Sequence, residues 1–220
     1  MATLQKNLLT LATKIDPIVK GTSTTATTAR FTLATVGVSD GTRFPKQRLL
    51  DIYNEARIVL FNALRGTEDF GRCVSGAFIP DTSITFSASG SYVVASKPTG
   101  YIDLVSLVDA SNVPIYVLDN SQKQELKSGN PDFVLSATNL YAFETGTQFR
   151  IPGTFGVGVG TIDYYGLTSW VLTDVTTGTA VEVFSPDIEP ILIELGCALA
   201  NEQSNADVLS LAKTLLNKKG

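Results

Sequence analysis

The sequence predicts an α+β protein in which the central and C-terminal helices form a helical bundle and an antiparallel β-rich domain is inserted between them. Three observations predict this fold class. Residues 45–66 carry apolar side chains at three- and four-residue spacing, the pattern of an amphipathic helix. The comparable segment lies far along the chain, at 187–218. The residues between them form short runs of alternating polarity separated by turns, which is typical of strands.

The central helix is expected to be covered on more than one side, because its apolar stripe is wide. Pro45 suits the first helical position, where its missing N–H costs nothing, and Gly66 suits the left-handed residue that ends a helix. A helix this apolar needs a partner, so the segments 43–66 and 185–220 are expected to pack into one helical bundle. The apolar face is formed by Leu49, Tyr53, Ala56, Leu60, Ala63 and Leu64, and the polar edge by Arg48, Asp51, Glu55 and Arg57.

Residues 1–42 are interpreted as an N-terminal arm with a flexible segment. A short helix is expected over 3–13, where leucines fall on one side. Residues 21–28 are rich in threonine and serine and lack packing side chains, so they are expected to be a mobile loop or linker. Residues 31–38 are apolar, and their pattern leaves both a strand and a docked arm open.

Residues 67–184 are expected to form the β-rich insertion. Turn signals such as Pro-Asp, Ser-Gly and Pro-Thr-Gly separate short runs of period-two character. A polar stretch at 120–128 contains helix formers and is followed by Gly129, which can end a helix. Strands are expected at 77–80, 83–87, 91–96, 101–108, 114–118, 133–135, 140–143, 148–151, 161–165 and 181–184.

The C-terminal region, 185–220, is expected to be helical. Asp187 can cap a first helix with Pro190 in its first turn, and Ser204 and Asp207 have the spacing of a capping box for a following helix. The pattern leaves open whether the region forms two helices or one bent rod.

The composition restricts the class of protein. Hydrophobic residues make up 44% and charged residues 17% of the 220-residue chain, which fits a protein that hides much of its surface in an assembly. A net charge of −4 provides no overall basic field for nucleic acid or an anionic membrane. No apolar run reaches the roughly 18 residues of a membrane span, and the N-terminus lacks a signal-peptide pattern. The chain is therefore expected to be made and kept in a cytoplasm until assembly, without a membrane partner.

The chain contains no histidine, which removes the commonest general base and the commonest zinc ligand. It also removes every nucleophile pair that depends on a histidine. The two cysteines, Cys73 and Cys197, are expected to be buried free thiols rather than a disulfide.

The glycine run and the acidic residues have structural interpretations that we prefer to chemical ones. The glycines of 153–160 miss the spacing of a phosphate-binding loop, so this segment is expected to be a hairpin connection or a mobile loop. Asp187 and Glu189 fit stabilisation of a helix start better than acid–base chemistry. Asp103 and Asp163 lie in predicted strands, and nothing in the sequence brings them together.

The other reactive and aromatic side chains are not predicted to bind a ligand or to take part in catalysis. Ser75 has no base beside it, and Lys97 has no Schiff-base context. Tyr164 and Tyr165 are interpreted as core or interface residues, and Trp170 as either an interface anchor or an ordinary half-buried tryptophan. The sequence therefore predicts no catalytic residue, no cofactor-binding residue and no metal ligand, in a protein that is not an enzyme.

The order of these segments resembles the head–tail adaptor (connector) proteins of tailed bacteriophages, the group that includes the tail tubular protein A of short-tailed phages. The resemblance spans roughly residues 39–218 and is carried by three stretches. They are Arg43-Phe44 leading into 49–57; the β-rich part with Pro114-Ile115, 131–141 and 148–152; and 162–167 followed by Pro186-Asp187 and the closing helices with 192–200.

The resemblance implies a structural protein of the virion neck or tail. Such proteins assemble as rings, often of twelve copies, between the portal protein and the tail or nozzle proteins. DNA passes through the lumen during genome ejection without sequence-specific binding. The resemblance also implies that assembly takes place in the host cytoplasm.

Other functions stay open beside this one. Another neck or tail completion protein of a phage virion belongs to the same class. A small carboxylate-dependent enzyme or ligand-binding domain belongs to a different class and would show carboxylates that converge in a pocket with shifted pKa values. A secreted adhesin-like β-domain is disfavoured by the helical ends. An adaptor would instead show apolar patches on opposite flanks.

Overall fold

The computed structural model of the chain describes residues 3–15, 44–119, 122–124, 135–154, 156–171, 173–174 and 182–218. The chain divides into two compact units. Residues 1–76 and 169–220 form the first, here called the helical unit, and residues 77–168 form the second, here called the sheet unit. The Thr-rich segment 21–28, the apolar segment 31–38 and most of the stretch 120–135 lie outside the described residues.

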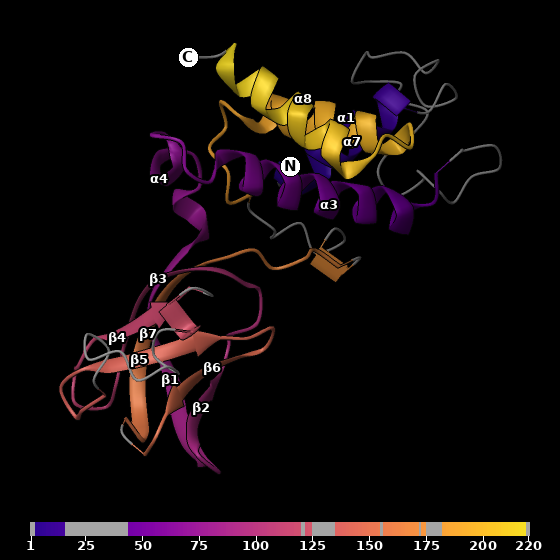
Figure 1. Ribbon diagram of the computed structural model, residues 1–220. Coiled ribbons are helices and arrows are strands. Elements are labelled where there is room, and N and C mark those ends of the chain that lie inside the picture. Colours follow the sequence, from indigo (N-terminus) through magenta and orange to yellow (C-terminus); the bar gives the residue numbers. More distant parts are fainter. Residues whose placement is uncertain are drawn as a thin grey trace. The chain divides into compact units, whose positions relative to one another are not determined.

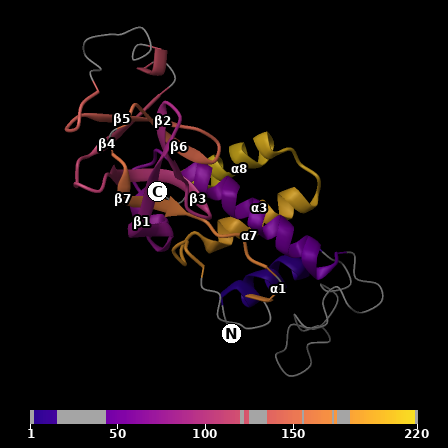
Figure 2. The ribbon, with the colours of Figure 1, turned by 90° about the horizontal axis from the view of Figure 1, so that it is seen from below.

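The helical unit contains helices from both ends of the sequence. They are α1 (Thr3–Ile15), α3 (Lys46–Leu64), α4 (Phe70–Cys73), α7 (Glu189–Ala200) and α8 (Asn205–Asn217). Helices α1, α3, α7 and α8 pack against one another (Figures 1 and 2). Leu4, Leu8 and Leu11 of α1 are buried, as are Leu192 and Leu195 of α7. Each helix therefore contributes one apolar face to a shared core.

Helix α3 forms where the pattern predicted it. Pro45 precedes its first turn, and Gly66 follows its last turn with a φ of +85°. Eleven of its residues are buried, which agrees with the prediction that this helix is covered on more than one side. Arg57 is among them, although it was assigned to the polar edge.

The C-terminal region forms two helices rather than one rod. Glu202 adopts a φ of +60° in the turn between them, and the Ser204 side chain accepts a hydrogen bond from the Asp207 N–H at 3.3 Å, as a capping box predicts. Ile188, not Asp187, is the N-cap of α7, with Pro190 in the first turn.

The sheet unit contains one seven-stranded sheet with the order β3-β7-β1-β2-β6-β5-β4. The first and last strands approach each other through a bridge between Val108 and Pro114, so the sheet nearly closes into a barrel. The core of this unit lies inside the curved sheet. The strands are β1 (Phe78–Ser89), β2 (Tyr92–Ser96), β3 (Tyr101–Val108), β4 (Ile115–Leu118), β5 (Leu140–Glu144), β6 (Gln148–Pro152) and β7 (Gly158–Gly166).

The predicted fold class is wrong: the chain is a mixed α/β fold with a near-barrel sheet, not a helical bundle with an inserted antiparallel β-rich domain. Strands β4 and β5 pair in parallel, from Ile115 with Leu140 to Leu118 with Phe143. A period-two pattern shows which side chains share a face of a strand, but it does not determine the direction of the neighbouring strand. The sequence therefore did not distinguish parallel from antiparallel pairing. Helix α1 also packs on α3 and α7, although the prediction built the bundle from the central and C-terminal helices alone.

Two predicted strands, 77–80 and 83–87, are one strand in the structure. The Pro80-Asp81 pair was interpreted as a turn, but β1 continues through it with a register shift between Ile79 and Thr82. Asp81 adopts a φ of +52° at this irregularity. A bulge absorbs the extra residue without ending the strand.

The glycine run is also different from the prediction of a hairpin connection or mobile loop. Gly158 and Gly160 lie within β7, which runs next to the end of β3. A Cβ at Gly160 would meet the Val108 carbonyl oxygen at 2.1 Å, and one at Gly158 would meet the Ala110 side chain at 2.7 Å. These glycines therefore permit a close approach of two backbones.

The last predicted strand, 181–184, is not formed. Residues 182–184 have no strand conformation and belong to the helical unit, where the Glu182 side chain is buried. The segment's alternating sequence resembles a strand, but its buried acid is paired with an arginine of α3.

The carboxylate of Asp163 connects three strands of the sheet unit. It accepts hydrogen bonds from the Ser106 hydroxyl of β3 at 2.7 Å and from the Asp81 N–H of β1 at 2.8 Å. These bonds hold the pKa of Asp163 below its ordinary value, so the ionised form stabilises the folded state.

We expect Asp163→Asn to lower the stability of the sheet unit at neutral pH by less than about 1 kcal/mol, because the carboxylate is partly exposed. The contribution of the ionised carboxylate is complete above the ordinary aspartate pKa of about 4 and is lost as pH falls through the lower folded pKa. The difference between variant and parent in urea unfolding should therefore shrink below about pH 4. An equal difference at pH 2 and pH 7 would contradict this role.

Candidate functional site

Three of the four acidic residues considered from the sequence are held in structural pairs, and the fourth, Asp103, lies opposite Tyr165 in the ladder of β3 and β7. Asp163 binds Ser106 and the Asp81 backbone, and Glu189 accepts a bond from Asn7 at 3.4 Å. Asp187 accepts bonds from the Ser185 hydroxyl and from Arg72. The Ser185–Asp187 bond is local, whereas the other contacts each join two segments of one unit, so these acids have architectural roles.

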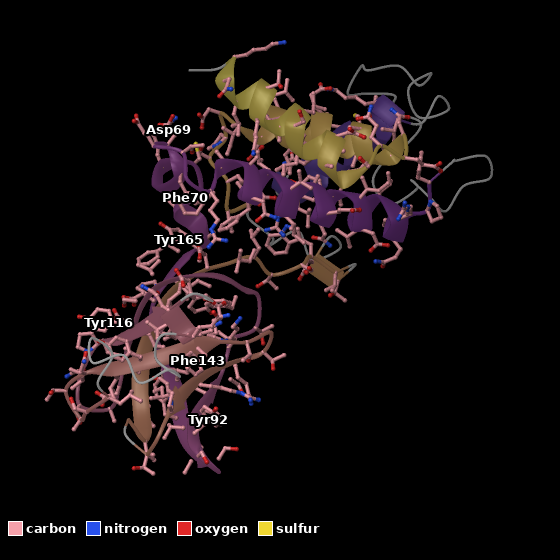
Figure 3. The ribbon with its side chains drawn as sticks, viewed as in Figure 1. Asp69, Phe70, Tyr92, Tyr116, Phe143 and Tyr165 are labelled. Atoms are coloured by element: carbon pink, nitrogen blue, oxygen red, sulfur yellow. The ribbon has the colours of Figure 1, made fainter. Side chains whose placement is uncertain are left out.

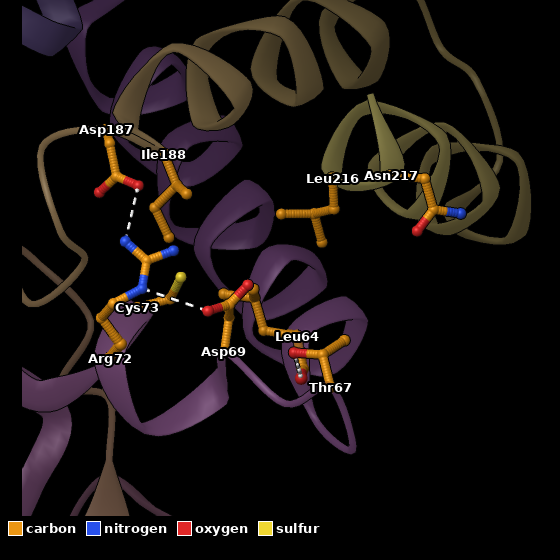
Figure 4. A pocket seen from close by; sticks show the side chains of 9 residues that line it. All are labelled: Leu64, Thr67, Asp69, Arg72, Cys73, Asp187, Ile188, Leu216 and Asn217. Carbon is orange, nitrogen blue, oxygen red and sulfur yellow. Dashed lines mark hydrogen bonds and ion pairs between the residues drawn. The ribbon is translucent and has the colours of Figure 1, made fainter. Parts of the chain in front are cut away.

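A pocket of the helical unit lies beside α4 and has a volume of about 560 Å³ (Figure 4). Leu64, Ile188 and Leu216 supply apolar surface, and Asp69, Arg72 and Asp187 supply charge. The Arg72 guanidinium extends between the two carboxylates, with Nε 3.2 Å from Asp69 and Nη1 3.3 Å from Asp187 (Figure 4). All three charged side chains are about half exposed or more, so they form a solvated rim around the apolar part of the pocket.

Cys73 lines the same pocket but is not activated as a nucleophile. Burial raises the pKa of its thiol, which outweighs the opposing effect of the neighbouring Arg72 charge. The thiol therefore stays protonated at neutral pH. Both cysteines are free, as predicted; Cys73 is buried, whereas Cys197 is only partly buried. The pocket is suited to holding an apolar side chain rather than to covalent chemistry.

We expect both thiols of the native protein to react more slowly than an ordinary free cysteine at pH 7, because burial raises both pKa values. The partly exposed Cys197 should be labelled before the buried Cys73. Labelling with a thiol reagent, followed by peptide mass spectrometry, measures the order. Modification of Cys73 first, at the rate of an exposed thiol, would show that the pocket lowers its pKa.

A buried polar cluster lies behind the exposed side of α3. Arg57 Nε donates to Glu182 at 3.1 Å, and the Tyr53 hydroxyl donates to the other carboxylate oxygen at 2.8 Å. Asn7 of α1 donates to the Tyr53 hydroxyl at 2.9 Å. The Arg57 and Glu182 side chains are only 2% and 1% exposed, so the charge pair is removed from water. Burial, followed by the Glu182 charge, raises the pKa of Tyr53 well above its ordinary value.

Trp170 is attached to α3 beside this cluster. The Arg57 guanidinium carbon lies 4.8 Å from the centre of the indole ring, a cation–π contact. The Asn54 side chain bonds the backbone N–H and C=O of Trp170, each at 2.9 Å. The cluster therefore fixes both the position of the tryptophan and the path of the chain around it.

Beside Trp170, apolar side chains reach the surface of the helical unit. Ile58 lies one helical turn after Asn54 and is 46% exposed, and Val171 follows Trp170 and is 54% exposed. We call Ile58, Trp170 and Val171 the α3 patch. Tryptophan and arginine are enriched among the residues that dominate protein–protein contacts, so this part of the helical unit is a candidate contact surface. Trp170 was singled out from the sequence, but Ile58 was not, because it lies within an apolar segment whose exposed side only the fold reveals.

The sheet unit has exposed apolar residues as well. Along β7, Ile162 and Tyr164 face the core while Val159 and Tyr165 lie on the opposite face. Val159 is 61% exposed. The ring of Tyr165, labelled in Figure 3, belongs to this unit. The Phe78 and Tyr165 rings lie 5.7 Å apart on neighbouring strands. Other exposed apolar residues of this unit are Val105, Tyr116 and Val157.

Among the described residues, no group of three or more histidine, cysteine or acidic side chains is placed to hold a metal ion. The same residues contain no helix that is long and apolar enough to cross a membrane. No protein-family model matches this chain, and no curated protein is significantly similar to it.

Proposed function

We propose that this chain is a head–tail adaptor of a tailed bacteriophage, a structural protein that acts through protein–protein contacts. In this role it forms a ring, of twelve copies as in the proteins that it resembles, between the portal and the tail or nozzle proteins. DNA passes through the lumen without sequence-specific binding. The observation that carries the proposal is the presence of exposed apolar residues on each of the two compact units.

A ring requires that two different surfaces of each copy meet in a head-to-tail contact. The α3 patch on the helical unit and the face of β7 that carries Val159 and Tyr165 on the sheet unit are two different surfaces. A contiguous patch of exposed apolar residues on a protein surface often marks an interaction site. Rigid positioning of Trp170 by Arg57 and Asn54 lowers the entropy cost of forming such a contact.

The composition supports the same proposal. Only 17% of residues are charged, and the net charge is −4, so the chain has little charge to keep a monomer surface solvated. A net negative chain also provides no strong general attraction for DNA, which suits a channel through which DNA must move.

Mass measurement of the purified chain in solution, alone and mixed with a candidate portal ring, tests the proposal. We expect a defined large ring, or a monomer that becomes a ring only on the portal. A chain that stays monomeric with every virion partner would contradict the proposal.

We expect Ile58→Asp to abolish ring formation, because it places a charge in the α3 patch at a residue that is not part of the buried core. Ser210→Asp is the matched control: Ser210 is an exposed residue of α8 and gains the same charge. Ring formation by the control but not by Ile58→Asp, with equal thermal stability of the two variants, is the expected result. A ring formed equally well by both would exclude the α3 patch from the contact.

A further inference from the structure

The hairpin of β1 and β2 opens away from its turn. Its ladder pairs Ser89 with Tyr92 and Ser87 with Val94, and it stops there. Before Ser87, β1 pairs with β7 alone, and after Val94, β2 pairs with β6 alone. No strand of the described part of the chain lies between the two diverging segments.

The opening forms a groove of about 460 Å³. Its lining contains five hydroxyl side chains and, in the described residues, no charged one; the hydroxyls belong to Thr82, Ser83, Thr85, Ser87 and Ser96. The lining also includes Ile84, Val94 and Pro98, of which Ile84 belongs to the buried core of the sheet.

The walls of the groove are strand edges. Successive residues of an antiparallel strand direct their N–H and C=O groups to opposite edges. The residues of β1 between Thr82 and Phe86 that are not bonded to β7 therefore direct these groups toward the groove. Proteins usually protect such an edge with lysine or another inward-pointing charge, and this edge has none in the groove.

We propose that this groove binds an extended, uncharged segment of a partner protein, which adds as a strand beside β1. An extended backbone satisfies the N–H and C=O groups of the wall, whereas a helix cannot because its own backbone is bonded internally. Nucleic acids and other polyanions are excluded because the lining has no cationic side chain. Threonine and valine side chains fit best, since cross-strand contacts with serine and threonine favour β-branched and hydroxyl residues. The inference does not depend on the proposed function.

The test is an NMR titration of the whole isotope-labelled chain with a neutral probe, a six-residue peptide of alternating threonine and valine with blocked ends. We expect saturable amide shift changes and slower amide exchange at residues 82–87 and 94–96. The same peptide with alternate backbone nitrogens methylated cannot complete a ladder and should not bind.

Two lysine variants sharpen the test. Thr85→Lys places a charge in the groove, and we expect it to weaken peptide binding by about tenfold or more. Thr154→Lys is the matched control, because Thr154 is an exposed threonine of the sheet unit that does not line the groove. It should bind the peptide as the parent does.

Three results would overturn the proposal. The first is the absence of saturable shifts at the groove, and the second is equal binding of the methylated peptide. The third is the appearance of the same shifts on raising the protein concentration without peptide, which would show that a second copy of the chain occupies the groove.

Discussion

Replacing Arg57 by alanine is expected to destabilise the helical unit by about 3–5 kcal/mol. The substitution leaves the Glu182 carboxylate buried without its cation, and an unpaired buried charge is costly. It also removes the cation–π contact with Trp170 and the packing of the long arginine side chain. Tyr53 and the Val183 N–H can still donate to Glu182, but neither carries a positive charge.

The fluorescence of Trp170, the single tryptophan of the chain, reports this loss directly because the ring contacts Arg57. The control is the double variant Arg57→Met with Glu182→Leu, which replaces both charges by apolar groups of similar size. We expect it to be more stable than either single variant, because no buried charge is left unpaired. A loss below about 1 kcal/mol in the Arg57→Ala variant would show that water reaches Glu182.

Replacing Gly160 by alanine is expected to destabilise the sheet unit by about 3 kcal/mol or more. The added Cβ would lie 2.1 Å from the Val108 carbonyl oxygen and 3.1 Å from the Asp109 carbonyl carbon. Both are backbone atoms, which cannot rotate away as a side chain can. Relief therefore requires β7 to move away from β3 and to lose part of its ladder.

Gly146→Ala is the matched control in the same unit, since nothing lies within 4 Å of a Cβ added there. Six of the seven tyrosines lie in the sheet unit and the tryptophan lies in the helical unit, so near-UV circular dichroism and tryptophan fluorescence follow the two units separately. We expect loss of the tyrosine signal at lower urea concentration for Gly160→Ala, and unchanged behaviour for Gly146→Ala. Equal stability of the two variants would contradict the close approach of β7 and β3.

Elements with a local physical cause could be predicted from the sequence. Helix α3 has both its amphipathic pattern and its end signals within the residues 45–66, and the cap at Ser204 depends on Asp207 only three positions later. Most strands were found because alternation is also a local pattern. These elements are confirmed within a few residues, although residues 182–184 alternate like a strand and form none.

Features that depend on distant partners could not be predicted. The parallel pairing of β4 and β5 depends on how the chain between Leu118 and Leu140 returns, which no local pattern specifies. Glu182 lies in a segment that alternates like a strand, but its burial depends on the hydrogen bond from Arg57, which lies 125 positions earlier. The glycines of β7 were interpreted as a loop because the sequence does not reveal that the backbone of Val108 lies beside them.

The candidate contact surfaces also divide into features with a local signal in the sequence and features that depend on distant partners. Trp170 could be marked as a candidate anchor from its residue type, but the exposure of Ile58 depends on which side of α3 the other helices cover. The groove between β1 and β2 has no signal in the sequence, because it results from the point at which a ladder ends.

The pairing of Phe78 with Tyr165 determines how the sheet unit responds to mechanical load. These residues lie near the first and last positions of the unit, on neighbouring antiparallel strands, and they face each other. A pulling force applied through the two connections would therefore act across the ladder of β1 and β7 and break its bonds one after another. Such a peeling geometry resists far less tension than strands that are sheared along their length, so the sheet unit should open under tension from this end while the ladder of β2 and β6 is still intact.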